Sequence, residues 1–217
     1  MVQAVLTMKY DLKPGNEPYH LHLQVQGRRA LLGLRLSQKE QSDRIYRLIQ
    51  VDGDLPPSAA YCLSILAQIR KHHVCLDARC GGGTTTVEIA RNMNVRSLIG
   101  VEAYPEVLYA AQGNAQAAGV SLRLVAADPE AFGLRSGKID RMICNLMRRS
   151  GEPSIDLRAF FQEVLRILTP DGLAVIIAED RQVIGQVLNE VEGMRLLKRR
   201  TLHLRGRHPD VYILQKS

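Results

Sequence analysis

Three carboxylates and a run of glycines are the residues of this sequence best suited to chemistry. Asp77, Glu102 and Asp128 each stand at or near the end of a short apolar segment with the composition of a β-strand. Because the carboxyl ends of parallel strands meet at one edge of a sheet, we expect these side chains to lie close together. Gly81-Gly82-Gly83 precede a helical pattern, so a ligand can approach the N–H groups at the start of that helix. The sequence therefore predicts one ligand site at this edge.

The positions of the carboxylates indicate which ligand fits. A carboxylate at Glu102 can accept hydrogen bonds from both hydroxyls of a ribose, and Asp128 can accept from an adenine amine. Asp77 would then lie near a cationic amino group. These features suit S-adenosylmethionine, which carries an ammonium, a sulfonium and an adenosine but no phosphate. A nicotinamide dinucleotide is a weaker alternative, because Thr86 stands where its fingerprint needs a third glycine.

The elements around these residues predict the fold class. From His73 onward, short apolar runs alternate with helical patterns, which is typical of an α/β, doubly wound, Rossmann-like sheet that is mostly parallel. Two final strand-like segments, with no helix between them, indicate an antiparallel C-terminal hairpin. The expected strands are 74–78, 96–103, 121–128, 138–145, 173–180, 194–204 and 210–217, and the expected helices are 84–93, 104–119, 156–172 and 181–193.

The segment before His73 has a different pattern. Residues 19–37 alternate apolar and polar side chains around a Gly-Arg-Arg turn, as a β-hairpin does, and PPSAAYCLSILAQIRK has the starting Pro and the apolar spacing of a helix. We therefore divide the chain into an N-terminal β-hairpin lead-in, residues 1–55, and a main domain, residues 56–217.

Composition limits the classes of protein. The 217 residues are 46% hydrophobic and 24% charged, and no apolar run approaches the ~20 residues that span a bilayer. The N-terminal stretch MVQAVLTMKYDLKPG lacks the pattern of a signal peptide, so we expect a cytoplasmic protein without a membrane partner. The cysteines have neither metal-site nor disulfide-framework spacing, so we expect buried, reduced thiols and no metal; they are Cys62, Cys75, Cys80 and Cys144.

The charge is basic and uneven. The formal net charge is +7, and the run RLLKRRTLHLRGR between Arg195 and Arg207 holds six Lys or Arg and no acid. Such a stripe is expected of a face that binds nucleic acid, although a solvated strand is the commoner explanation of a single basic run. Arg199 and Arg200, at its centre, are the candidate RNA contacts.

Several of these segments together resemble a known family. VCLDARCGGGTTTVEIA, LIGVEAYPEVLYAAQGNAQAAGV and VAADPEAF resemble the class I methyltransferase domain of the THUMP-associated RNA methyltransferases, which modify the exocyclic amine of guanine in tRNA. The resemblance extends to ALLGLRLSQKEQSDRIYR and to the closing basic hairpin. Ser58, in the first turn of the PPSAAYC helix, is a further candidate near the cofactor's carboxylate, or else an ordinary helix cap. The resemblance implies cofactor contacts at Asp77, Gly81, Gly83, Thr84, Glu102 and Asp128.

The stretch ICNLMRRSG follows the fourth expected strand, where the family places an Asn-Pro-Pro-aromatic loop. The resemblance implies that Asn145 is catalytic: its side-chain oxygen and the next carbonyl would accept from the target amine, beside a ring that stacks on the flipped base. Leu146, Met147 and Arg148 depart from that pattern, since they supply neither proline nor ring. Our hypothesis is that Arg148 stacks on a base and Arg149 meets a phosphate; the alternative is a solvated loop pair.

The expected function is an S-adenosylmethionine-dependent methyltransferase acting on RNA, with tRNA as the implied partner. Two alternatives stay open: a non-catalytic RNA-binding or scaffold protein that retains the fold, favoured by the altered loop, and a methyltransferase for a small molecule or protein. In the family, a THUMP module that grips tRNA precedes this domain. The sequence leaves open whether the chain is a piece of a longer protein, uses a separate RNA-gripping domain or subunit, or has lost that substrate.

Overall fold

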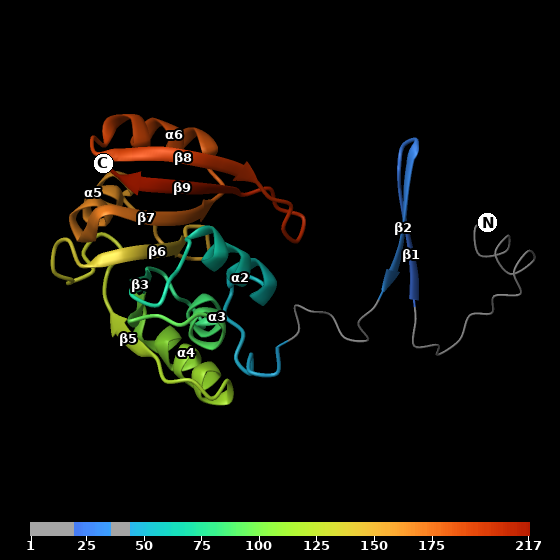
Figure 1. Cartoon of the computed structure of the whole chain (residues 1–217), viewed down its shortest axis with the longest axis horizontal. Coiled ribbons are helices and arrows are strands. Elements are labelled where there is room, and N and C mark those ends of the chain that lie inside the picture. Colours follow the sequence, from blue (N-terminus) through green and yellow to red (C-terminus); the bar gives the residue numbers. More distant parts are fainter. Residues whose placement is uncertain (1–19, 36–43) are drawn as a thin grey trace, which may run out of the picture. The chain divides into compact units, whose positions relative to one another are not determined.

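The structure is a computed structural model that describes residues 20–35 and 44–217. The chain divides into two compact units, residues 1–43 and 44–217 (Figure 1). Residues 44–55, which the sequence assigned to the lead-in, thus belong to the second unit. Residues 1–19 and 36–43 lie outside the described residues, so the start of the chain and part of the family-like segment ALLGLRLSQKEQSDRIYR cannot be compared with the predictions.

The first unit contains an antiparallel hairpin, which confirms the one predicted within residues 19–37. β1 (His20–Gln26) pairs with β2 (Arg29–Arg35), with Val25 opposite Ala30. Gly27 in the connecting turn has a φ of 58°, a conformation that glycine adopts at little cost.

The second unit is built on a seven-stranded sheet with the order β5-β4-β3-β6-β7-β9-β8, from bottom to top in Figure 1. The last strand along the chain, β9, pairs antiparallel with both of its neighbours, and the other pairings are parallel. The Rossmann-like fold and its antiparallel C-terminal hairpin are therefore confirmed. The strands are β3 (Val74–Asp77), β4 (Ser97–Glu102), β5 (Arg123–Ala126), β6 (Ile139–Asn145), β7 (Leu168–Ala178), β8 (Met194–Thr201) and β9 (Asp210–Lys216).

Helices cover both faces of this sheet, because successive residues of each strand point to opposite faces. On one face, α5 and α6 pack Phe160 and Ile184 into a core that includes Met142. On the other face, α2 and α3 pack against Ile143 and Val175, and α4 packs beside α3. The helices are α2 (Pro57–Leu66), α3 (Thr84–Asn92), α4 (Pro105–Ala117), α5 (Leu157–Ile167) and α6 (Arg181–Glu190).

The start of β7 differs from the prediction. We expected a helix to continue through residue 172 and end at Pro170-Asp171-Gly172, but α5 ends at Ile167 and β7 begins at Leu168. The Pro-Asp-Gly residues instead form an irregularity within the strand: Asp171 has a φ of 62°, and the register against β6 shifts between Ile139 and Arg141. Extra residues opposite a shorter partner segment are accommodated as a bulge, and Asp tolerates the left-handed conformation.

The cysteines agree with the expectation in part. Cys75, Cys80 and Cys144 are buried, whereas Cys62 is exposed on α2. Within residues 20–35 and 44–217, no three His, Cys, Asp or Glu side chains are grouped to hold a metal. In the same ranges, every helix is too short or too polar to cross a membrane.

Candidate functional site

The glycine turn, Gly81–Gly83, connects β3 to α3 at the point where the order of the sheet reverses. Gly81 and Gly83 have φ values of 55° and 81°, in the left-handed region that favours glycine. A Cβ on Gly83 would lie 3.1 Å from the backbone of Ala111 in α4. These glycines are therefore required by the turn and by the close approach of α4, in addition to any ligand.

Glu102 reaches the glycine turn from the end of β4, as predicted. Its Oε2 atom accepts from Gly81 N at 3.0 Å, and its Oε1 atom accepts from Ala103 N at 3.0 Å. The Nη2 atom of Arg149 also donates to Oε2, at 3.0 Å, and both side chains are almost fully buried. A guanidinium of the same chain thus pairs with Glu102, and the contact of Glu102 with a ribose diol stays a prediction.

Asp77 is buried beneath the turn. Its Oδ2 atom accepts from the hydroxyl of Thr86 at 2.6 Å. Burial raises the pKa of Asp77 to about 7, and the nearby charges of Asp54 and Glu102 act in the same direction, against the hydrogen bond from Thr86. Thr86, which the sequence marked only as a departure from the dinucleotide fingerprint, is therefore a structural partner of Asp77.

A segment before α2, residues 44–55, covers the glycine turn. Asn114 of α4 binds both backbone groups of Ile49, accepting from N at 3.0 Å and donating to O at 2.8 Å, and it also donates to Gly82 O at 2.8 Å. Tyr46 donates to Glu88 of α3 at 2.7 Å. These contacts hold the segment against α3, α4 and the turn.

The covering segment brings Asp54 to the glycine turn. Its Oδ1 atom accepts from Gly82 N at 3.1 Å, while its buried Oδ2 atom has no hydrogen-bond partner among the described residues. Burial raises the pKa of Asp54. A buried carboxylate oxygen without a partner is costly, and a cationic amino group would satisfy it. Asp54 is therefore better placed than Asp77, whose Oδ2 is bonded to Thr86, to meet an ammonium.

A cavity of about 220 Å³ opens where β4 and β5 end. Its lining includes Glu102, Tyr104, Asp128 and Glu152. Asp128 is exposed, and its Oδ1 atom accepts from Glu130 N at 3.0 Å. An aromatic side chain and several carboxylates around one cavity suit an adenosine, whose hydroxyls and amine donate and whose base stacks.

The predicted cofactor residues thus come together in part. Thr84, the first residue of α3, has a buried hydroxyl with no partner among the described residues. Ser58 lies in the first turn of α2 with an exposed side chain. The free Oδ2 of Asp54, the free hydroxyl of Thr84 and the adjoining cavity fit the ammonium, carboxylate and adenosine of S-adenosylmethionine. The guanidinium of Arg149, paired with Glu102, occupies part of this site.

Asn145 ends β6 beside the glycine turn, but its polar groups already have partners. Its side chain donates to Gly53 O at 2.9 Å and accepts from Met147 N at 3.1 Å. Its backbone carbonyl accepts from Arg79 Nη1 at 2.8 Å. In this state Asn145 holds the covering segment to the sheet, and its contact with an acceptor stays a prediction.

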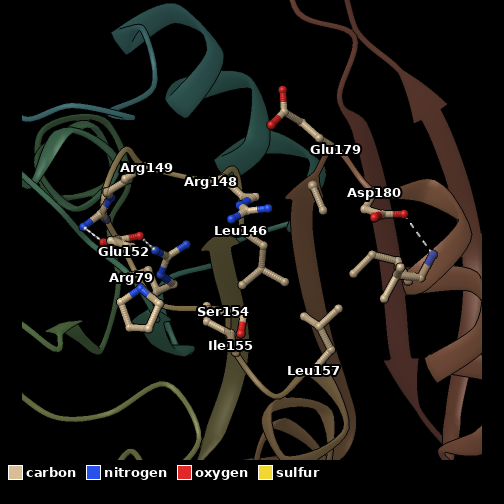
Figure 2. Close-up of a pocket in the computed structure, with 14 residues that line it drawn as sticks. Arg79, Leu146, Arg148, Arg149, Glu152, Ser154, Ile155, Leu157, Glu179 and Asp180 are labelled. Carbon is tan, nitrogen blue, oxygen red and sulfur yellow. Dashed lines mark hydrogen bonds and ion pairs between the residues drawn. The ribbon is translucent and has the colours of Figure 1, made fainter.

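The β6 loop, Leu146–Glu152, carries the two arginines that the sequence singled out. Figure 2 shows Arg79, Glu152 and Arg149 side by side: Glu152 pairs with both arginines, with Arg149 Nη1 at 3.1 Å. Arg149 is only 8% exposed, whereas Arg148 is exposed. The alternative of a solvated loop pair therefore does not hold for Arg149, which faces the residues at the glycine turn, while Arg148 faces the surface; their contacts with RNA stay predictions.

A second cavity, here called the acceptor cavity, opens beyond the ends of β6 and β7 (Figure 2). It has a volume of about 260 Å³. Apolar side chains line it, together with a rim of charged residues from the β6 loop and the start of α6. It shares Arg79 and Glu152 with the cavity at β4 and β5. The apolar residues include Leu146, Ile155, Leu157, Val183 and Ile184, and the charged ones Arg148, Glu179 and Asp180.

The basic residues of β8 lie on both faces of the sheet. Arg200 pairs with Val211 and Lys198 with Ile213, on the face that carries α2. Arg199 pairs with Tyr212, on the α6 face, and lies 3.7 Å from Asp210 Oδ2. The stripe read from the sequence is therefore divided by strand alternation, and Arg199 and Arg200 cannot contact one backbone in the same way.

Sequence reasoning missed four residues of this site. Asp54 stands in VDGDLPP, where an acid beside a glycine and before a Pro-Pro helix start was a usable signal. Arg79 is a cation between Asp77 and the glycines, and Glu152 follows Arg149 at the i,i+3 spacing of an ion pair. Asn114, within an Ala-rich helix, carried no signal in the sequence.

Comparisons with known proteins agree with this fold. A family model described as a methyltransferase domain matches residues 75–172. TrmN from Thermus thermophilus superposes with a TM-score of 0.79 at 23% identity, covering 100% of this chain and 66% of that one, so this chain spans slightly less than two thirds of it.

Two other solved structures share the fold. An rRNA methylase from Streptococcus thermophilus has a TM-score of 0.57 at 18% identity, with 71% of this chain and 93% of that chain covered. NSun6 from Pyrococcus horikoshii has a TM-score of 0.58 at 16% identity, covering 72% of this chain and 51% of that one. At these identities the likeness establishes the fold. Residues 75–172 thus match a methyltransferase domain, whose cofactor is S-adenosylmethionine.

Proposed function

We propose that this protein transfers a methyl group from S-adenosylmethionine to RNA, at the amine of a base in a tRNA-like substrate. The observation that carries the proposal is the acceptor cavity, which lies beside Asn145 and shares Arg79 and Glu152 with the cavity at Glu102 and Asp128. Its apolar lining and charged rim suit a flipped base attached to an anionic backbone. RNA also agrees with the family resemblance and with the rRNA methylase that shares this fold.

The residues have distinct roles in this proposal. The bound cofactor would supply an electrophilic methyl group. Glu102 and Asp128 would hold its adenosine, and Asp54 its ammonium. Asn145 would orient the acceptor amine through its backbone carbonyl, which accepts a hydrogen bond from Arg79 in the present state. Arg148, exposed at the cavity rim, would stack on the base.

Transfer of isotope-labelled methyl groups to fractionated cellular RNA tests the proposal. We expect label in the tRNA fraction, and nucleoside mass spectrometry should place it on a base amine. Asn145→Ala should lose the activity, and Asn189→Ala, an exposed change in α6, should retain it. Saturable cofactor binding without transfer to any RNA fraction would contradict the proposal.

One observation favours the second candidate, a non-catalytic RNA-binding protein. All polar groups of Asn145 that would meet an amine are hydrogen-bonded within the chain. Such a protein would bind RNA in the transfer assay without labelling it, which separates it from the first proposal.

RNA binding itself has a measurable signature in both cases. Phosphate neutralisation releases counterions, so the affinity should fall linearly on a log–log salt plot. Arg200→Ala should reduce the slope by about 1, whereas Arg199→Ala should change it less because Asp210 partly neutralises Arg199. Equal slopes for the wild type and Arg200→Ala would mean that β8 is not part of the RNA-binding surface.

A further inference from the structure

The space that the glycine turn leaves open is filled by side chains of the same chain. A Cβ placed on Gly81 or Gly82 would collide with the carboxylate of Asp54. A Cβ on Gly53 would lie 2.6 Å from Cγ of Arg149, and Nη2 of Arg149 lies 3.2 Å from the Cβ position of Gly81. The turn is therefore covered before any ligand arrives.

Arg149 occupies the atoms that a ribose needs. Its Nη2 atom donates to Oε2 of Glu102, which already accepts from Gly81 N. A ribose diol would have to donate to this same carboxylate. S-adenosylmethionine also carries a sulfonium and an ammonium, and a buried guanidinium beside them would be repelled. Arg149 and the cofactor cannot both bind Glu102 in this arrangement.

The same arginine connects the cofactor residues to the acceptor side. Glu152 pairs with Arg149 and with Arg79, and Arg79 also donates to the carbonyl of Asn145. Arg149 and Glu152 both belong to the β6 loop and both line the acceptor cavity. Three ion pairs and one hydrogen bond thus connect Glu102 continuously to the carbonyl of Asn145.

We propose that Arg149 is a positioning residue that competes with the cofactor for Glu102, and that cofactor binding displaces it and moves the β6 loop beside the acceptor cavity. The displaced guanidinium adds positive charge to the acceptor side only when the cofactor is bound. Cofactor binding would then precede acceptor binding. This competition rests on S-adenosylmethionine as the cofactor and does not depend on which substrate is methylated.

Calorimetric titration with S-adenosylhomocysteine tests the competition, with the wild type and Arg149→Gln compared directly. The neutral amide cannot hold Glu102 as an ion pair, so we expect Arg149→Gln to bind at least about tenfold more tightly. Arg135→Gln is the matched control, because it removes the same charge from an exposed position that lines neither cavity; its affinity should stay within about twofold of the wild type. Arg149→Lys retains the charge and should bind nearly as the wild type does.

A fluorescence experiment tests the loop movement independently of affinity. The sequence contains no tryptophan, so Ser150→Trp, at an exposed position next to Arg149, introduces a single reporter. Adding S-adenosylhomocysteine should shift its emission. In Ser150→Trp/Arg149→Gln the emission should already be close to the ligand-bound value, and further ligand should change it little.

Either experiment can overturn the inference. Equal or weaker binding by a folded Arg149→Gln, checked by circular dichroism, would mean that Arg149 does not compete, and the proposed methyl transfer would still stand. An emission that does not respond to saturating ligand would refute the loop movement. If S-adenosylhomocysteine bound neither the wild type nor any variant, both the competition and the proposed function would fail.

Discussion

At the glycine turn the polar groups are mostly buried and many of them are paired within the chain, whereas the acceptor cavity beyond β6 and β7 is lined by apolar side chains under a charged rim. Glu102 accepts hydrogen bonds from a backbone amide and a guanidinium of the same chain, and Asp77 accepts one from a hydroxyl. Around the acceptor cavity, Ile155 and Leu157 are only half-buried and Arg148 is exposed. The two regions share Arg79 and Glu152 but are stabilised by different forces.

This difference indicates where substitutions should be costly. Removing one member of a buried ion pair or hydrogen-bond set leaves its partner without compensation, which costs several times more than a surface contact. Trimming a half-buried apolar side chain removes only a limited area. Substitutions at the cofactor residues should therefore affect stability and binding together, while those at the acceptor cavity should affect substrate use with little loss of stability.

The largest effect is expected for Glu102→Gln. Arg149 would lose its buried partner and retain only Glu152, so we expect the free energy of unfolding to fall by about 3 kcal/mol. S-adenosylhomocysteine binding should be lost as well, because the ribose diol loses its acceptor. Urea unfolding and calorimetry measure both, with the exposed Glu192→Gln as the control. If Glu102→Gln were as stable as the wild type, substitutions at the glycine turn would not be the costlier ones.

Asn114→Ala should have the next largest effect on stability. The Asn114 side chain is fully buried and makes three hydrogen bonds to Ile49 and Gly82. Losing them leaves backbone groups unpaired, for an expected cost of about 2 kcal/mol. Cofactor affinity should fall too, since the segment that carries Asp54 is released. Thermal unfolding and calorimetry check this result, with Asn189→Ala on the surface for comparison; unchanged affinity would show that the segment does not contribute to binding.

Asp77 should give the free energy of unfolding a pH dependence of intermediate size. Its pKa in the folded protein is about 7, against an ordinary value of 3.8, so the folded state binds more protons between these values. Stability from this group is present below pH 4 and is lost as the pH rises toward 7, by up to about 1.4 kcal/mol per pH unit. In Asp77→Asn this slope should disappear from urea unfolding measured at pH 5 and 6. Identical slopes in the two proteins would refute the raised pKa.

The smallest change in stability is expected for Leu157→Ala in the acceptor cavity. Because Leu157 is half-buried and lines this cavity but not the one at β4 and β5, its truncation should cost only about 1 kcal/mol. Methyl transfer to RNA should fall more strongly than S-adenosylhomocysteine binding, since the apolar contact to the acceptor is reduced. A kinetic assay beside calorimetry separates these effects. A parallel loss of cofactor affinity would mean that the two cavities do not act as distinct sites.

Much of the fold followed from local patterns. Strand composition and helical spacing predicted the parallel order from Val74 onward, because each buried strand and amphipathic helix carries its own periodicity. The Pro-Asp-Gly stretch at residues 170–172 misled the prediction, since the same residues that end a helix also suit a bulge inside a strand. Nothing local distinguishes these two uses.

The site was predicted less completely than the fold. The placement of Glu102, Asp128 and the glycines at one edge of the sheet could be predicted, because the ends of parallel strands meet there as a consequence of chain direction alone. Asp54 and Asn114 were missed because their contacts cross about 30 to 65 positions of sequence. A helix-face Asn reads as an ordinary surface residue until α4 is placed against the covering segment.

The sequence by itself determined the order of strands and helices along the chain, the glycine turn and the acids at the sheet edge. It could do so because periodicity and backbone conformation are local properties. Only the tertiary structure decided which groups are paired. It placed Arg149 on Glu102, Arg79 on the carbonyl of Asn145, and Arg199 and Arg200 on opposite faces of the sheet. Long side chains of like charge are interchangeable in a sequence, and the packing around them determines which carboxylate each one meets.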